Sequence, residues 1–223
     1  MAKANAVKIT VGDKMKADVL SLKEIEQFVL DSGSDDLPTF GGTFEGGAHI
    51  QQIPDEIAGC IKAILDRIAV PKVAYLEVGV AAGGTAFLFN HFLSPTKVVL
   101  VDDNKHHKAG LRPQVLQGIE YHELIGRSLD EPILQAAKDA GPYDIIMLDG
   151  DHSYAGAKLD TVLYLEMLNP GGFLVYHDSA YSPEVARVVR ELKNDSAMEF
   201  IDEFMTNKYG RRLGVALFRK VGK

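Results

Sequence analysis

From residue 73 onward, short apolar runs alternate with longer segments of helical pattern, and this alternation strongly limits the folds open to the chain. Runs this continuous are typical of parallel strands that are buried on both faces of a sheet. The pattern therefore predicts an α/β protein with a doubly wound, mostly parallel sheet and crossover helices. The runs are "VAYLEV", "KVVLVD", "IEYHELIG", "YDIIMLDG" and "GFLVYHD", and the expected helices lie near 84–93, 130–140, 154–167 and 183–194.

Segments on both sides of this pattern complete the expected architecture. After the fifth run, "MEFIDEF" and "RRLGVALFRK" are separated by the turn-like "MTNKYG", which predicts a terminal hairpin with an antiparallel strand. Near the other end, "SLKEIEQFVLDSG" predicts a short helix with Ser21 as N-cap and Glu24 completing a capping box, and Pro54 suits the first turn of a second helix. We expect an N-terminal appendage over 1–50, whose glycine-rich loop could act as a lid, and one main domain over 51–223.

The composition argues against several partners. A net charge of -7 opposes binding to nucleic-acid phosphates, which relies on clustered Lys and Arg. The N-terminus lacks a sustained apolar stretch, so we expect a cytoplasmic protein without a signal peptide or a membrane partner. Cys60 lies on the apolar stripe of a predicted helix, which favours a core thiol over a nucleophile.

A glycine-rich turn follows the first predicted strand. In "EVGVAAGGT", Gly79, Gly83 and Gly84 permit a tight turn and a close approach of backbone to ligand at a helix N-terminus. The dinucleotide fingerprint requires glycine where this chain has Ala81, so a ligand without phosphates fits better. Asp102 ends the second run 23 residues after Gly79, a spacing that suits hydrogen bonds from ribose hydroxyls.

Acidic residues and a histidine end the fourth and fifth runs. Because neighbouring strands of this topology lie about 4.8 Å apart, Asp149 is expected to meet His177 and Asp178 at one edge of the sheet. Converging carboxylates favour a hard divalent cation, and an imidazole ligand at His177 would shift the preference from magnesium towards manganese. Alternatively, His177 is hydrogen-bonded beneath the site. Asp151 is either a further ligand or a cap of the next helix.

Four stretches carry a resemblance to a known family. "YLEVGVAAGGT" followed by "VVLVDD" resembles the first two motifs of class I S-adenosylmethionine-dependent methyltransferases. "IIMLDGDHSY" and "NPGGFLVYHD" are similar to the metal-dependent small-molecule O-methyltransferases, which include sugar O-methyltransferases and cephalosporin-hydroxylase-like enzymes and, more distantly, catechol O-methyltransferases. The resemblance implies a Rossmann-like sheet of seven strands, S-adenosyl-L-methionine and Mg or Mn as cofactors, and a homo-oligomer. The implied acceptor is a hydroxyl of a sugar, a phenol or a natural-product intermediate.

The resemblance also implies roles for individual residues. The residues implied to contact the cofactor are Glu77, Gly79, Ala81 and Gly83 along its methionine part, Thr85 near its carboxylate, Asp102 at the ribose, Ser128 at the adenine edge, and Asp149. Asp149 and Asp178 match metal-holding positions, and His152 matches a general base. For Ser128 the alternative is a cap of the following helix.

These residues together predict an in-line methyl transfer. A cation holds the acceptor, His152 takes a proton from the acceptor hydroxyl at neutral pH, and Asp149 shares in the catalysis. Alternatively, His152 is a loop histidine bonded to a carboxylate, and the chain is an NAD-dependent oxidoreductase or a non-catalytic binding protein with the same fold. The sequence favours methyl transfer because Ala81 departs from the dinucleotide pattern and the acidic residues are retained. His106, His107 and Lys108 are expected to be solvated surface.

Overall fold

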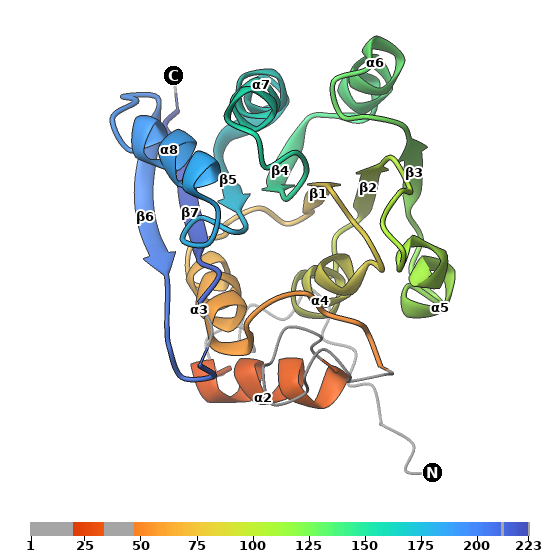
Figure 1. The fold of residues 1–223 in the computed structure, drawn as a ribbon, viewed down its shortest axis with the longest axis vertical. Helices are drawn as coiled ribbons and strands as arrows, with labels where there is room; N and C mark the ends of the chain where they lie inside the picture. Colours follow the sequence, from red (N-terminus) through yellow and green to blue (C-terminus); the bar gives the residue numbers. More distant parts are fainter. Residues whose placement is uncertain (1–19, 34–46, 211, 223) are drawn as a thin grey trace.

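The computed structural model describes residues 20–33, 47–210 and 212–222. Within them, seven strands form one sheet in the order β3-β2-β1-β4-β5-β7-β6, which confirms the doubly wound, mostly parallel arrangement (Figure 1). β1 pairs in parallel with β2 on one side and with β4 on the other, and β4 pairs in parallel with β5. The strands are β1 (Ala74–Val78), β2 (Lys97–Asp102), β3 (His122–Ile125), β4 (Tyr143–Leu148), β5 (Leu168–Tyr176), β6 (Met198–Phe204) and β7 (Val215–Lys220).

Helices cover both faces of the sheet. α3, α4 and α5 lie on one face with α2 outside them, and α6, α7 and α8 lie on the other (Figure 1). Each face buries its own apolar cluster, which explains why the central strands are apolar along their whole length. The helices are α2 (Leu22–Ser32), α3 (Pro54–Leu65), α4 (Gly84–Leu93), α5 (Arg112–Val115), α6 (Glu131–Ala140), α7 (Tyr154–Leu165) and α8 (Pro183–Leu192), with a 3-10 turn η2 (Ala109–Leu111).

The N-terminal helix α2 is part of the same core. Its predicted capping box is confirmed, because Ser21 Oγ accepts the Glu24 N–H at 3.3 Å and the Glu24 carboxylate accepts the Ser21 N–H at 2.7 Å. Ile25 and Val29 are fully buried in the cluster that contains the apolar side of α3. Most of the glycine-rich loop expected as a lid lies at 34–46, outside the described residues.

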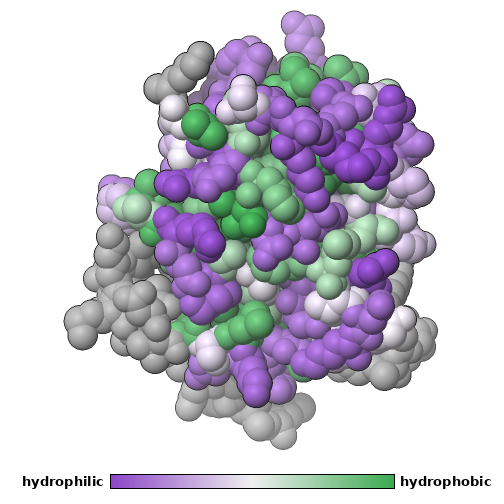
Figure 2. All heavy atoms as spheres, turned by 90° about the vertical axis from the view of Figure 1, so that its left-hand side faces the viewer, coloured by the Kyte–Doolittle hydropathy of each residue, from purple (hydrophilic) through white to green (hydrophobic). Residues whose placement is uncertain are grey.

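The C-terminal hairpin is confirmed, and its second strand lies inside the sheet. β7 is antiparallel to both β5 and β6, which leaves β6 at the edge. Glu199, Asp202 and Glu203 place charges along this edge, where they discourage pairing with another chain. Figure 2 shows this side of the molecule, with hydrophilic residues interspersed among hydrophobic ones. Among the described helices, none has both the length and the apolar character needed to cross a membrane.

Candidate active site

A cavity of about 560 Å³ opens at the carboxyl ends of the parallel strands. This is the edge where ligands bind in open α/β sheets. The predicted site residues that line it are Gly79, Ala81, Asp102, Ser128, Asp149, His152, His177 and Asp178. The structure therefore brings together residues from the ends of five strands that lie far apart in the sequence.

The turn after β1 forms one wall of the cavity. Gly79 has a φ of +81°, and a Cβ at this position would lie 2.0 Å from the carbonyl oxygen of Asp149. No side chain fits there, because β4 leaves the sheet directly against this backbone. Gly83 and Ala81 also have positive φ, at +88° and +47°, and Ala81 adopts this conformation without being glycine.

Asp102 lies behind the same turn with both carboxylate oxygens engaged. One oxygen accepts the N–H groups of Val80 at 2.7 Å and Ala81 at 2.9 Å, and the other accepts the Asn104 N–H at 2.7 Å. Asp102 lines the cavity, and its contact with ribose hydroxyls stays a prediction. Its observed role is to tie the end of β2 to the turn after β1.

Two carboxylates and one imidazole converge where the cavity meets the ends of β4 and β5. His152 Nε2 lies 3.4 Å from Asp149 Oδ1 and 3.5 Å from Asp178 Oδ2, and one ligand atom from each residue lies within 4.8 Å of the others. Two carboxylates and an imidazole are a donor set that suits a divalent cation such as Mn²⁺. The residues present therefore fit the expected metal.

His177 lies beneath this group and is not one of its three members. Its Nδ1 is 3.1 Å from Asp149 Oδ2, and its side chain is buried. The same Nδ1 atom lies 3.8 Å from Asp178 Oδ2, so His177 also adjoins both carboxylates. Whether His177 binds the cation or holds the Asp149 carboxylate by a hydrogen bond stays a prediction.

The electrostatics of these residues are strongly coupled. Burial alone would raise the pKa of Asp149, but the charges and hydrogen bonds of His177 and His152 outweigh it and lower the pKa. The hydrogen bond to Asp149 raises the pKa of His152, and Asp178 adds to this effect. A cation between the two carboxylates would offset their field at His152 and favour its neutral form.

Asp151 and Ser128 have structural contacts at the rim of the cavity. Asp151 Oδ1 accepts the Ser153 N–H at 2.8 Å and so closes the turn before α7, whose N-cap is Ser153. Ser128 does not cap α6, because Asp130 is the N-cap of that helix. The Ser128 carbonyl accepts a hydrogen bond of 3.0 Å from the Tyr164 hydroxyl of α7.

Three residues assigned to the cofactor do not line the cavity. The Glu77 side chain lies on the α3 side of the sheet, where it accepts a hydrogen bond of 2.6 Å from the Tyr75 hydroxyl, because alternate residues of a strand face the same side. Thr85 is buried and accepts a hydrogen bond from Gln52. Gly83 is the N-cap of α4 and lies against Leu116. Direct cofactor contact by these residues stays a prediction.

Residues 76–179 match the sequence model of a protein family described as a methyltransferase domain. The matched region runs from β1 to the residue after Asp178, so it includes the glycine turn, the end of β2 and the acidic group. Residues 76–179 therefore resemble a methyltransferase domain. This match favours methyl transfer over the oxidoreductase alternative.

Solved structures of other proteins have the same fold as this chain. An uncharacterized protein of Acanthamoeba polyphaga mimivirus, R132, is 24% identical over 168 residues, which are 70% of this chain and 71% of the relative. The O-methyltransferase from Bacillus cereus in complex with SAH aligns with a TM-score of 0.61 at 16% identity, covering 95% and 97% of the two chains. The O-methyltransferase TomG from Streptomyces achromogenes in complex with SAM has a TM-score of 0.61 at 15% identity, covering 98% and 100%.

Several residues that line the cavity were not predicted from the sequence. His106 lines the cavity, although it was expected to be solvated surface, because the segment after β2 folds back over the sheet edge. The other unexpected lining residues are Gln51, Asp103, Arg127, Leu129, Tyr181 and Leu213. They lie in connecting segments without a motif, so the sequence held no signal for them.

Proposed function

We propose that this protein transfers a methyl group from S-adenosyl-L-methionine to a hydroxyl oxygen of a small molecule. The observation that carries the proposal is the convergence of His152 with Asp149 and Asp178 in the same cavity as the Gly79–Ala81 turn. The turn offers backbone to a cofactor without phosphates, and the acidic group offers a proton acceptor and a cation site. Proteins of the same fold whose solved structures contain SAM or SAH support this cofactor.

The proposed reaction is a direct displacement. His152 accepts the proton of the acceptor hydroxyl, and the oxygen forms a bond to the methyl carbon. The bond from that carbon to the sulfonium sulfur breaks, and its electron pair stays on sulfur. The products are a methyl ether, S-adenosylhomocysteine and a proton on the imidazole. Because the sulfonium is already activated, alignment of the two reactants supplies most of the rate.

We propose that Asp149 and Asp178 hold a divalent cation, while His177 orients Asp149 from beneath. When bound, such a cation lowers the pKa of an acceptor hydroxyl and fixes its position. We assign His152 as the base, because its side chain is 43% exposed and faces the cavity, whereas the Asp178 side chain is 10% exposed. The homo-oligomer and the cytoplasmic location stay predictions.

Calorimetric titration tests the cofactor and the metal separately. We expect S-adenosylhomocysteine to bind the wild-type protein, NAD not to bind, and Mn²⁺ to bind the wild type but not the Asp149→Asn variant. That variant is the matched control, because it keeps the side-chain shape and removes the charge. Binding of NAD without S-adenosylhomocysteine would overturn the proposed cofactor, and equal Mn²⁺ affinity in the two proteins would overturn the proposed cation site.

A further inference from the structure

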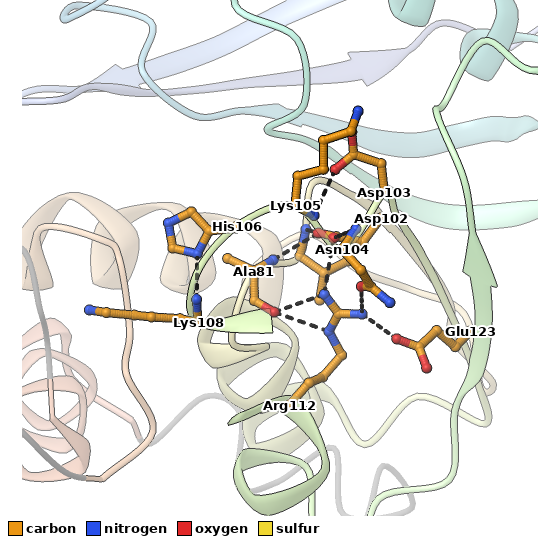
Figure 3. A network of polar contacts seen from close by, with 10 residues as sticks. Ala81, Asp102, Asp103, Asn104, Lys105, His106, Lys108, Arg112 and Glu123 are labelled. Atoms are coloured by element: carbon orange, nitrogen blue, oxygen red, sulfur yellow. Dashed lines mark hydrogen bonds and ion pairs between the residues drawn. The ribbon is translucent and has the colours of Figure 1, made fainter. Parts of the chain in front are cut away.

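A buried arginine lies directly behind the turn after β1. Arg112 begins α5, and its side chain is 2% exposed. Nε donates to the Ala81 carbonyl at 3.1 Å, and Nη2 donates to the same oxygen at 2.8 Å and lies 3.2 Å from Asp102 Oδ1. Nη1 donates to Asn104 Oδ1 at 3.0 Å and to the Glu123 carboxylate (Figure 3). These contacts use the full donor capacity of a guanidinium, which has five N–H groups.

The turn is therefore held from two sides. Asp102 accepts the N–H groups of Val80 and Ala81, and Arg112 donates twice to the Ala81 carbonyl. Ala81 has a φ of +47°, a conformation that is disfavoured for any residue with a Cβ unless the surroundings impose it. The Arg112 and Asp102 contacts are what impose it here.

Arg112 itself is not among the residues that line the cavity, whereas Ala81 and Asp102, which it contacts, are. We propose that Arg112 is a positioning residue that fixes the turn after β1 in the shape that binds S-adenosylmethionine. The inference rests on the proposed function, because it assumes that this cavity takes that cofactor. Arg112 thereby contributes to the cofactor affinity although its side chain does not line the cavity.

The donor geometry indicates that lysine cannot replace this arginine. A lysine at this position would keep the positive charge beside Asp102 but lacks the planar fork that reaches the Ala81 carbonyl with two N–H groups. Arg112→Lys therefore removes the two hydrogen bonds to the Ala81 carbonyl but keeps a cation beside the buried Asp102 and the partly exposed Glu123. It is the variant of choice, because Arg112→Met would leave Asp102 and Glu123 uncompensated.

The test is calorimetric titration of S-adenosylhomocysteine into the wild type, Arg112→Lys and the control Glu123→Gln. We expect about a tenfold or greater loss of affinity in Arg112→Lys, with unchanged Mn²⁺ binding at Asp149 and Asp178, which Arg112 does not contact. Glu123→Gln removes only the outermost contact and should stay within about threefold of the wild type. If folded Arg112→Lys binds S-adenosylhomocysteine as tightly as the wild type, the proposal is wrong. If the wild type itself does not bind it, the proposed function fails instead.

A second substitution separates positioning from general destabilisation. Glycine adopts positive φ without steric cost, so Ala81→Gly in the Arg112→Lys background should recover at least about threefold of the lost affinity. Because glycine at a positive φ also changes the stability of the fold, urea unfolding of each variant must show that all are fully folded under the titration conditions. No recovery in a double variant that folds would count against a role of Arg112 through the conformation of Ala81.

Discussion

At the scale of single residues, the chemistry of the site depends on where a few side chains are held. His152 reaches both Asp149 and Asp178 from the segment between β4 and α7, whereas His177 is fixed beneath Asp149. The two histidines differ in exposure, although both lie next to the same carboxylate. This difference supports the proposal that His152 exchanges a proton with the substrate and that His177 orients Asp149.

Replacing His152 with alanine should separate binding from catalysis. We expect turnover to fall by roughly 10²- to 10⁴-fold, the usual contribution of a general base. The affinity for S-adenosylhomocysteine should stay within about threefold, because the base is not assigned to hold the cofactor. Steady-state kinetics and calorimetry measure both quantities, with exposed His107→Ala as the matched control. Turnover within a few-fold of the wild type would exclude His152 as the base.

At the scale of elements, a buried carboxylate of α3 holds the segment between β6 and β7. Glu56 is fully buried, and it accepts the N–H groups of Thr206 at 3.0 Å, Leu213 at 3.3 Å and Gly214 at 2.8 Å. The carbonyls of 213–214 in turn accept the N–H groups of 179–181, next to Asp178. A helix near the N-terminus thereby sets the position of a wall of the active site.

Glu56→Ala should weaken this connection strongly. It leaves three backbone N–H groups without their acceptor, so we expect a loss of at least about 2 kcal/mol in the free energy of unfolding. Asp55→Ala is the control, because Asp55 accepts only the Thr206 hydroxyl at 2.7 Å and should cost about 1 kcal/mol. Urea unfolding measures both, and hydrogen exchange should rise at the Leu213 and Gly214 amides. Equal losses in the two variants would contradict this role of Glu56.

At the scale of the whole molecule, the sheet buries an acid that is not part of the cavity. Glu77 is 1% exposed and is bonded to the Tyr75 hydroxyl. Burial raises the pKa of Glu77 to about 8 from its usual 4.5, against the lowering effect of Tyr75. The folded protein therefore keeps this proton over a range in which the unfolded chain loses it. The stabilisation from this proton is fully present below pH 4.5, the usual pKa of the acid. It is lost as the pH rises through about 8, the pKa of Glu77 in the folded protein.

The global stability should reflect this titration. Between about pH 5 and pH 8, Glu77 should lower the free energy of unfolding by up to about 1.4 kcal/mol per pH unit. Glu77→Gln cannot ionise and keeps an acceptor for Tyr75, so its advantage over the wild type should grow with pH. Urea unfolding of the two proteins at several pH values measures the difference. A constant difference across the range would show that Glu77 is not buried as a neutral acid.

Part of the site could be predicted because it depends on local sequence order. The glycines of the turn, the acid at the end of β2 and the polar ends of β4 and β5 all follow apolar runs, and parallel strands bring their carboxyl ends to one edge. Arg112 could not be predicted in this way. It lies in a segment without a motif, and its importance comes from contacts with Ala81 and Asp102 across the fold.

The sequence by itself determined the class of fold, the caps of α2, the C-terminal hairpin and the strand ends that meet at the cavity. The periodicity of apolar residues and local capping chemistry are sufficient for these features. Only the tertiary structure decided that β7 lies inside the sheet, that His152 as well as His177 approaches the two aspartates, and that Glu77 faces the core. These depend on side-chain direction and on contacts between segments distant in sequence, which no local pattern specifies.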